Sequence, residues 1–95
     1  MASSGGGSTP SSGDAVAAYI IDRTQLSPTG SEVVGWRYII PSGADGAWAG
    51  KTGQIATLTS SGWTYAEPVP GQLAYIENEG RLTVYSMGSW LNSVL

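Results

Sequence analysis

Residues 35–53 read GWRYIIPSGADGAWAGKTG, and this stretch decides the fold. It opens with residues 36–40, whose aromatic and β-branched side chains favour a strand, and Pro41 ends that strand because proline has no N–H to donate. Glycines then surround Trp48, and their freedom to adopt positive φ angles would let this tryptophan fold back over a sheet. The stretch therefore predicts a strand followed by a loop that carries a large aromatic side chain.

Strand signals continue at short spacing on the C-terminal side of this stretch. Alternating and β-branched patterns predict strands at residues 54–59, 63–67, 72–77, 81–86 and 89–92. Turn residues separate these strands, while Pro68 and Pro70 remove two ladder donors and force a corner instead of a hairpin. We therefore expect an all-β fold for residues 27–95, a small antiparallel meander or barrel-like domain of short strands.

The N-terminal residues 1–26 have a different character. The first thirteen are mostly Ser and Gly, which cannot bury enough apolar surface to offset the entropy lost on ordering. Asp14 is a plausible N-cap for a short helix, whereas Tyr19, Ile20 and Ile21 form a good strand triplet. We expect an extended N-terminal arm whose strand triplet contacts another chain.

The composition restricts the possible partners. Charged residues make up 12% of the 95 residues, about half the usual share, and such a surface suits a protein that neighbours largely cover. Seven acidic residues outnumber four scattered basic ones, so no basic stripe is available for nucleic acid. The chain starts without the pattern of a signal peptide and contains no apolar run of membrane-spanning length. We expect synthesis in the cytoplasm, and neither nucleic acid nor a membrane as a partner.

Catalytic and metal sites are hard to assemble from these residues. The chain has neither cysteine nor histidine, which excludes disulfides and the nucleophilic sites that depend on Cys or His. Glu77 and Glu79 flank Asn78 as paired acids or cation ligands would, but a solvated hairpin tip explains them better. The glycines of residues 43–53 have neither the spacing of a nucleotide-binding loop nor a helix after them. We therefore expect no enzymatic activity, no cofactor and no metal.

A set of short motifs carries a resemblance to a known family. The motifs are RYII at 37–40, GADGAWAG at 43–50, GQIA at 53–56, GWTY at 62–65, GQLAY at 71–75 and EGRL at 79–82. Over residues 27–91 their order and spacing closely resemble a small uncharacterised domain family that recurs in phage and prophage tail-fibre and appendage proteins and in gene-transfer-agent clusters. The resemblance implies association with virion structure, and no catalytic residues come with it.

The resemblance and the composition together predict a bacteriophage virion structural protein. We expect a homo-oligomer, with a trimer as the expected form, that is assembled in the host cytoplasm and located in the virion. Other virion proteins would be its partners. In this interpretation the N-terminal arm anchors the β domain to a tail fibre, or to the capsid or tail as a decoration.

The alternative function is a glycan-binding module of a phage fibre, with a host-surface glycan as partner. Trp48, Trp63 and Tyr65 would then form an aromatic platform for sugar rings, or contact a protein partner at an interface. A core that contains no Phe must also draw its large side chains from Trp and Tyr, which is the plainer explanation. Leu58 and Leu73 stand where the family pattern tends to carry aromatics, which weakens the glycan interpretation.

Overall fold

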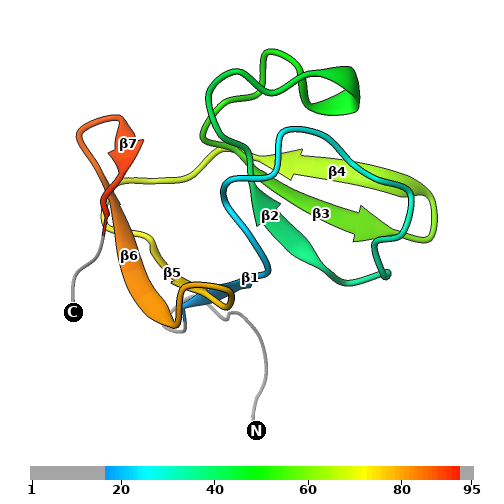
Figure 1. The fold of residues 1–95 in the computed structure, drawn as a ribbon. Coiled ribbons are helices and arrows are strands. Elements are labelled where there is room, and N and C mark those ends of the chain that lie inside the picture. Colours follow the sequence, from blue (N-terminus) through cyan, green and yellow to red (C-terminus); the bar gives the residue numbers. More distant parts are fainter. Residues whose placement is uncertain (1–16, 93–95) are drawn as a thin grey trace, which may run out of the picture.

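The computed structural model describes residues 17–92, which form seven strands in two sheets (Figure 1). The strands are β1 (Ala18–Ile20), β2 (Arg37–Ile39), β3 (Ile55–Thr59), β4 (Gly62–Ala66), β5 (Leu73–Ile76), β6 (Arg81–Ser86) and β7 (Ser89–Trp90). A single turn of 3-10 helix, Gly46–Trp48, lies in the loop between β2 and β3. The prediction of an all-β fold is confirmed, and the six strands expected after residue 35 all form.

The two sheets are each built from local hairpins, with one exception. In the first sheet the strand order is β1-β5-β6-β7, and in the second it is β2-β3-β4. The β2-β3-β4 and β5-β6-β7 pairings are antiparallel, as a meander requires. The exception is β1, which pairs in parallel with β5, from Ala18 beside Ala74 to Ile20 beside Ile76. This pair joins distant parts of the chain and was not predicted.

The two sheets meet where the chain leaves β1. The Ile21 N–H donates to the Arg37 carbonyl at 2.8 Å, and the Ile39 N–H donates to the Asp22 carbonyl at 3.2 Å. On the other side, the Trp90 indole N–H donates to the Gly53 carbonyl at 2.9 Å. These contacts tie both ends of the first sheet to the second, so the described residues form one domain.

The second sheet is covered on both faces, which explains why its strand β2 carries consecutive apolar residues. Ile39 and Ile55 pack against the first sheet, in a cluster completed by Ile20, Ala74 and Ile76. On the opposite face a second cluster is formed by Tyr38, Ile40, Trp48 and Ala56. Strands that are buried on both faces carry continuous rather than alternating apolar residues. The run Tyr38–Ile40 is therefore buried throughout.

The loop between β2 and β3 provides the cover for the second face. Its base is closed by hydrogen bonds from the Ile40 N–H to Gln54 and from the Gly53 N–H to Ile40, at 3.0 and 2.7 Å. Gly46 and Gly50 adopt φ angles of 60° and 77°, which an L side chain rarely adopts. In Figure 1 this loop lies above the β2-β3-β4 sheet. The structure agrees with the expectation that glycines let Trp48 fold back.

The predicted boundary between arm and domain at residue 27 is not where the structure places it. Ile20 has no exposed surface and belongs to the first core cluster, and Ile21 packs against the second. The strand triplet therefore pairs within its own chain, because β5 offers it a strand edge and an apolar face. The rest of the predicted arm, residues 1–16, lies outside the described residues.

Glu32 organises the connection from β1 to β2. Its carboxylate accepts hydrogen bonds from the Thr29 N–H at 2.8 Å, the Thr29 hydroxyl at 3.0 Å, the Gly30 N–H at 3.0 Å and the Gln25 amide at 2.8 Å. Desolvation raises the pKa of this carboxyl. The hydrogen bonds outweigh that effect and lower its pKa from 4.5 to about 2.

We expect Glu32→Gln to destabilise the fold at neutral pH by about 1 kcal/mol, the usual scale for hydrogen bonds to one group. Because the folded-state pKa of Glu32 is depressed, its contribution is full above pH 4.5 and is lost as the pH falls towards about 2. Urea unfolding of both proteins across that range should show the two stabilities converging in acid. Asp45→Asn is the control, since Asp45 makes no side-chain cap. A difference that does not change with pH would contradict this role.

The β6–β7 hairpin carries a strained residue at its tip. Met87 and Gly88 form the two-residue turn, with φ angles of 54° and 86°. Among residues 17–92, Met87 is the one residue other than glycine that has a positive φ angle. Turns of this kind favour Asn or Gly at the first position. The Met87 side chain is 98% exposed, so packing does not compensate for the strain.

We expect Met87→Asn to raise the free energy of unfolding by about 0.5–1 kcal/mol, because Asn tolerates positive φ. Met87→Val should have the opposite effect, since a β-branched residue is least tolerated there. Thermal unfolding of both variants measures the difference. If Met87→Asn were the less stable protein, the exposed side chain would have to make a stabilising contact.

Candidate functional site

The aromatic residues proposed as a platform pack together around the buried Trp48, and Trp63 and Tyr65 are partly buried. Trp48 has no exposed surface, and its ring centroid lies 5.3 Å from those of both Tyr38 and Trp63. The Trp48 and Trp63 rings are nearly perpendicular, at 84°. Tyr65 is partly buried, and its hydroxyl donates to the Ala47 carbonyl at 3.1 Å. Sugar rings stack on exposed, roughly coplanar faces, and these three rings do not provide one.

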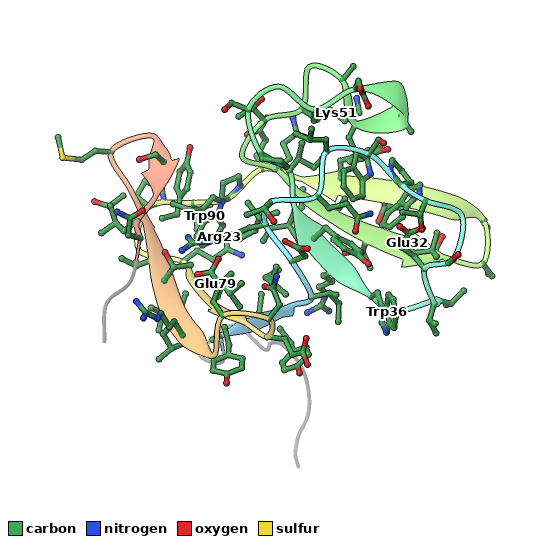
Figure 2. All side chains as sticks on the ribbon, viewed as in Figure 1. Arg23, Glu32, Trp36, Lys51, Glu79 and Trp90 are labelled. Atoms are coloured by element: carbon green, nitrogen blue, oxygen red, sulfur yellow. The ribbon has the colours of Figure 1, made fainter. Side chains whose placement is uncertain are left out.

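Contacts from the loop hold this cluster in place. The Lys51 ammonium lies 4.8 Å from the centroid of the Tyr65 ring, a cation–π distance (Figure 2 labels Lys51). Burial raises the pKa of the Tyr65 hydroxyl. The Trp48 indole nitrogen is buried and has no hydrogen-bond partner within residues 17–92. Together these contacts make the cluster the core of the second sheet and its loop.

A single arginine joins three separate parts of the chain. Arg23 follows β1 and donates to both carboxylate oxygens of Glu79, in the β5–β6 turn, at 2.9 Å each. It also donates to the carbonyls of Leu91 and Asn92 at 2.7 and 2.6 Å. Figure 2 shows Arg23 and Glu79 pointing toward each other. The arginine therefore links the segment that follows β1 and the segment that follows β7 to the tight turn between β5 and β6.

The two acids of the turn around Asn78 have different surroundings. Glu79 is held by Arg23, and Glu77 is exposed after β5. Within residues 17–92, no group of three or more His, Cys, Asp or Glu is placed to hold a metal ion. Among the same residues, no helix has the length and apolar character needed to cross a membrane.

One surface of the first sheet stands out by its side chains. Tyr19 of β1 lies beside Tyr75 of β5, Tyr75 lies opposite Leu82 of β6, and Leu73 lies opposite Val84. Directly opposite residues project to the same side of a sheet. We call these five residues the outer face. Tyr19 is 53% exposed, Leu73 40% and Tyr75 37%, and the Tyr19 and Tyr75 rings stack with centroids 5.9 Å apart.

The inner side of the same strands contrasts with the outer face. Ile20, Ala74, Ile76 and Thr83 have no exposed surface. β5 is thus apolar on both sides, and β6 carries Leu82 and Val84 on the outer side, although the described residues cover only the inner side. A contiguous apolar surface that is exposed to solvent commonly marks a site of interaction with another molecule. The outer face is the candidate functional site.

The predicted contact residues are thus distributed differently from expectation. Of the arm contacts, Tyr19 lies on the outer face, whereas Ile20 is a core residue and Ile21 is partly buried against the second cluster. Trp48 is also core, and Trp63 and Tyr65 pack against it. Sequence reasoning missed the other four residues of the outer face. The available signal was the sequence 73–76, LAYI, which is apolar at every position and so does not mark a solvent side.

Comparisons with known proteins address the chain as a whole. Neither the curated proteins nor the solved structures contain a match to it. A family model described as "Protein of unknown function (DUF2793)" matches residues 13–91. This match begins before β1, in agreement with the place of that strand in the fold. With nearly all of its length matched, the chain belongs to this uncharacterised family, DUF2793.

Proposed function

We propose that this protein is a structural component of a bacteriophage particle, an oligomeric part of a tail fibre or of a capsid or tail decoration. The phage association rests on the motif resemblance over residues 27–91. The structural role is supported by one observation above all, the exposed apolar outer face on a chain of which only 12% is charged. Such a surface is costly for a protein that stays free in solution and useful for one that is built into an assembly.

The fold suits a structural role, in which a rigid domain offers its surface for contact with neighbouring molecules. Arg23 and the Trp90 indole fasten the two sheets and the C-terminal segment together. Binding of pre-organised surfaces avoids the entropy cost of ordering loops. In an assembly, each copy contributes a modest contact and symmetry repeats it.

We propose further that the Gly/Ser-rich residues 1–16 attach the domain to its scaffold, since β1 itself belongs to the domain. Truncation separates the two parts. Removal of residues 1–16 leaves β1 in place, whereas removal of residues 1–26 also deletes a core strand and Arg23. The first truncation should give a folded protein that is not incorporated into particles. The second should fail to fold.

The test of the proposed function is the composition of washed particles. Mass spectrometry of particles purified by density gradient should find the protein at a fixed copy number, and a labelled version should mark one place in electron micrographs. The chain with residues 1–16 replaced by a shuffled sequence of the same composition controls for length and polarity. Particles that contain none of the protein would refute the proposal.

A further inference from the structure

The loop between β2 and β3 carries a peptide link that is open to chemical rearrangement. Asp45 precedes Gly46, and this pair begins the single turn of 3-10 helix that ends at Trp48 (Figure 1). In such a pair the main-chain nitrogen readily attacks the aspartate carboxyl group, because glycine has no side chain to shield the nitrogen or to restrict its approach. The pair thus places a reactive link in the loop that covers the second core cluster.

The two groups that would react are both accessible. Asp45 is exposed, and its side chain makes no capping hydrogen bond to the turn. Gly46 is also exposed, and its N–H has no hydrogen-bond acceptor within residues 17–92. A group that holds no hydrogen bond loses none when it reacts. Within the described part of the chain, neither reacting group is therefore protected by the fold.

The backbone at Asp45 also favours the reaction. A five-membered ring closes when Cβ of Asp45 comes into line with the Gly46 nitrogen about the bond between Cα and the carbonyl carbon. The ψ angle of Asp45 is −169°, which is closer to this alignment than the ψ angles of an α-helix or of an ordinary β-strand. Groups that are held near the reacting geometry react faster than groups that must first rotate into it.

We propose that the link between Asp45 and Gly46 is a site of spontaneous isomerisation to isoaspartate in the folded protein. The Gly46 nitrogen bonds to the Asp45 carboxyl carbon, and the carboxyl hydroxyl leaves with the proton of the nitrogen as water. A second water molecule then opens the succinimide ring. Cleavage between the nitrogen and the side-chain carbonyl carbon restores aspartate, whereas cleavage between the nitrogen and the main-chain carbonyl carbon gives isoaspartate. No group is oxidised or reduced.

Isomerisation changes the contacts that hold Trp48. In the unmodified chain the Trp48 N–H donates to the Asp45 carbonyl at 3.1 Å. In isoaspartate this carbonyl becomes part of a free carboxylate outside the main chain, and the chain to Gly46 is longer by one carbon atom. The turn then no longer fixes Trp48 as before. Because Trp48 has no exposed surface and belongs to the second core cluster, the isomerised protein should unfold at a lower urea concentration.

Ageing of the full chain at physiological temperature and pH tests the proposal. Mass spectrometry with fragmentation measures isoaspartate at each site, in the protein and in a short peptide of the same local sequence. Asp45 should isomerise at least as fast in the protein as in its peptide. Asp22 is the internal control, because its carboxylate accepts hydrogen bonds from the Thr24 N–H and hydroxyl at 2.7 and 2.8 Å.

The control site should behave differently from Asp45. Isomerisation of Asp22 should be about tenfold slower in the protein than in its own peptide, since its carboxylate is held away from the next nitrogen. If the folded protein slowed Asp45 as strongly as Asp22, the proposal would be overturned. This inference is independent of the proposed function, because the reaction needs no partner.

Asp45→Glu separates isomerisation from other damage that accumulates on ageing. Glutamate keeps the charge but would have to close a six-membered ring, which forms much more slowly, and an exposed position should tolerate the change. Aged wild-type protein should contain an isoaspartate fraction with a lower urea midpoint, whereas aged Asp45→Glu should keep its midpoint. An equal loss in both chains would refute the role given to this link.

Discussion

Trp48→Ala should leave about half of the protein unfolded in the absence of denaturant. Trp48 has no exposed surface and contacts the rings of both Tyr38 and Trp63. Removal of such a side chain costs about 3–5 kcal/mol, through lost burial and the cavity left behind. A core of this size, without disulfides or a metal, supplies a net stability of only about 3–5 kcal/mol. The loss is therefore as large as the stability itself.

Urea unfolding followed by far-ultraviolet circular dichroism measures this effect without relying on tryptophan fluorescence. Trp36→Ala is the matched control, because Trp36 has the same side chain at the start of β2 but is 37% exposed (Figure 2 labels Trp36). It should lose about 1 kcal/mol or less. Trp48→Phe should be intermediate, since it keeps a ring in the cavity and removes an indole N–H that has no partner among the described residues. Equal losses for Trp48→Ala and Trp36→Ala would contradict the central place of Trp48.

The second large effect is expected at Arg23. Arg23→Ala removes the bidentate ion pair to Glu79 and leaves the carbonyls of Leu91 and Asn92 without this donor. Hydrogen bonds to charged groups contribute about 1.5–3 kcal/mol each when buried, and partial exposure reduces this. Since the Arg23 side chain is 15% exposed and that of Glu79 28%, we expect a total loss of about 2–3 kcal/mol.

Arg23→Lys tests whether charge alone is enough. A lysine ammonium cannot reach all four acceptor atoms in the fork geometry of a guanidinium, so most of the loss should remain. Arg37→Ala is the control, an exposed arginine on β2 whose removal should change stability by less than about 0.5 kcal/mol. Hydrogen exchange should also rise at residues 89–92 in Arg23→Ala, because the C-terminal segment loses its anchor. Full stability of Arg23→Lys would show that the geometry is unimportant.

These two residues differ in what the sequence revealed about them. The glycine-flanked Trp48 indicates a loop that folds back, because glycine φ angles and a large apolar side chain act locally. Arg23 gives no such signal. Its partners lie 56 and 68 positions away, and a pairing over that distance depends on how the whole chain is folded.

The sequence by itself determined the strands. Residues 55–59, 62–66, 73–76 and 81–86 were placed within one or two positions, since alternation and turn residues act between neighbours. Only the tertiary structure decided that β1 belongs to the domain and not to an arm, because its partner β5 is distant in the chain.

The tertiary structure also decided which aromatic and apolar side chains are available to a partner. Trp48 and Trp36 look alike in the sequence, yet one is buried by its loop and the other is at the surface. Tyr75 and Ile76 look equally apolar, yet successive side chains of a strand point to opposite faces of the sheet, so one is exposed and the other is buried. Which side becomes the core depends on where the second sheet packs. Local residue patterns carry no information about that choice.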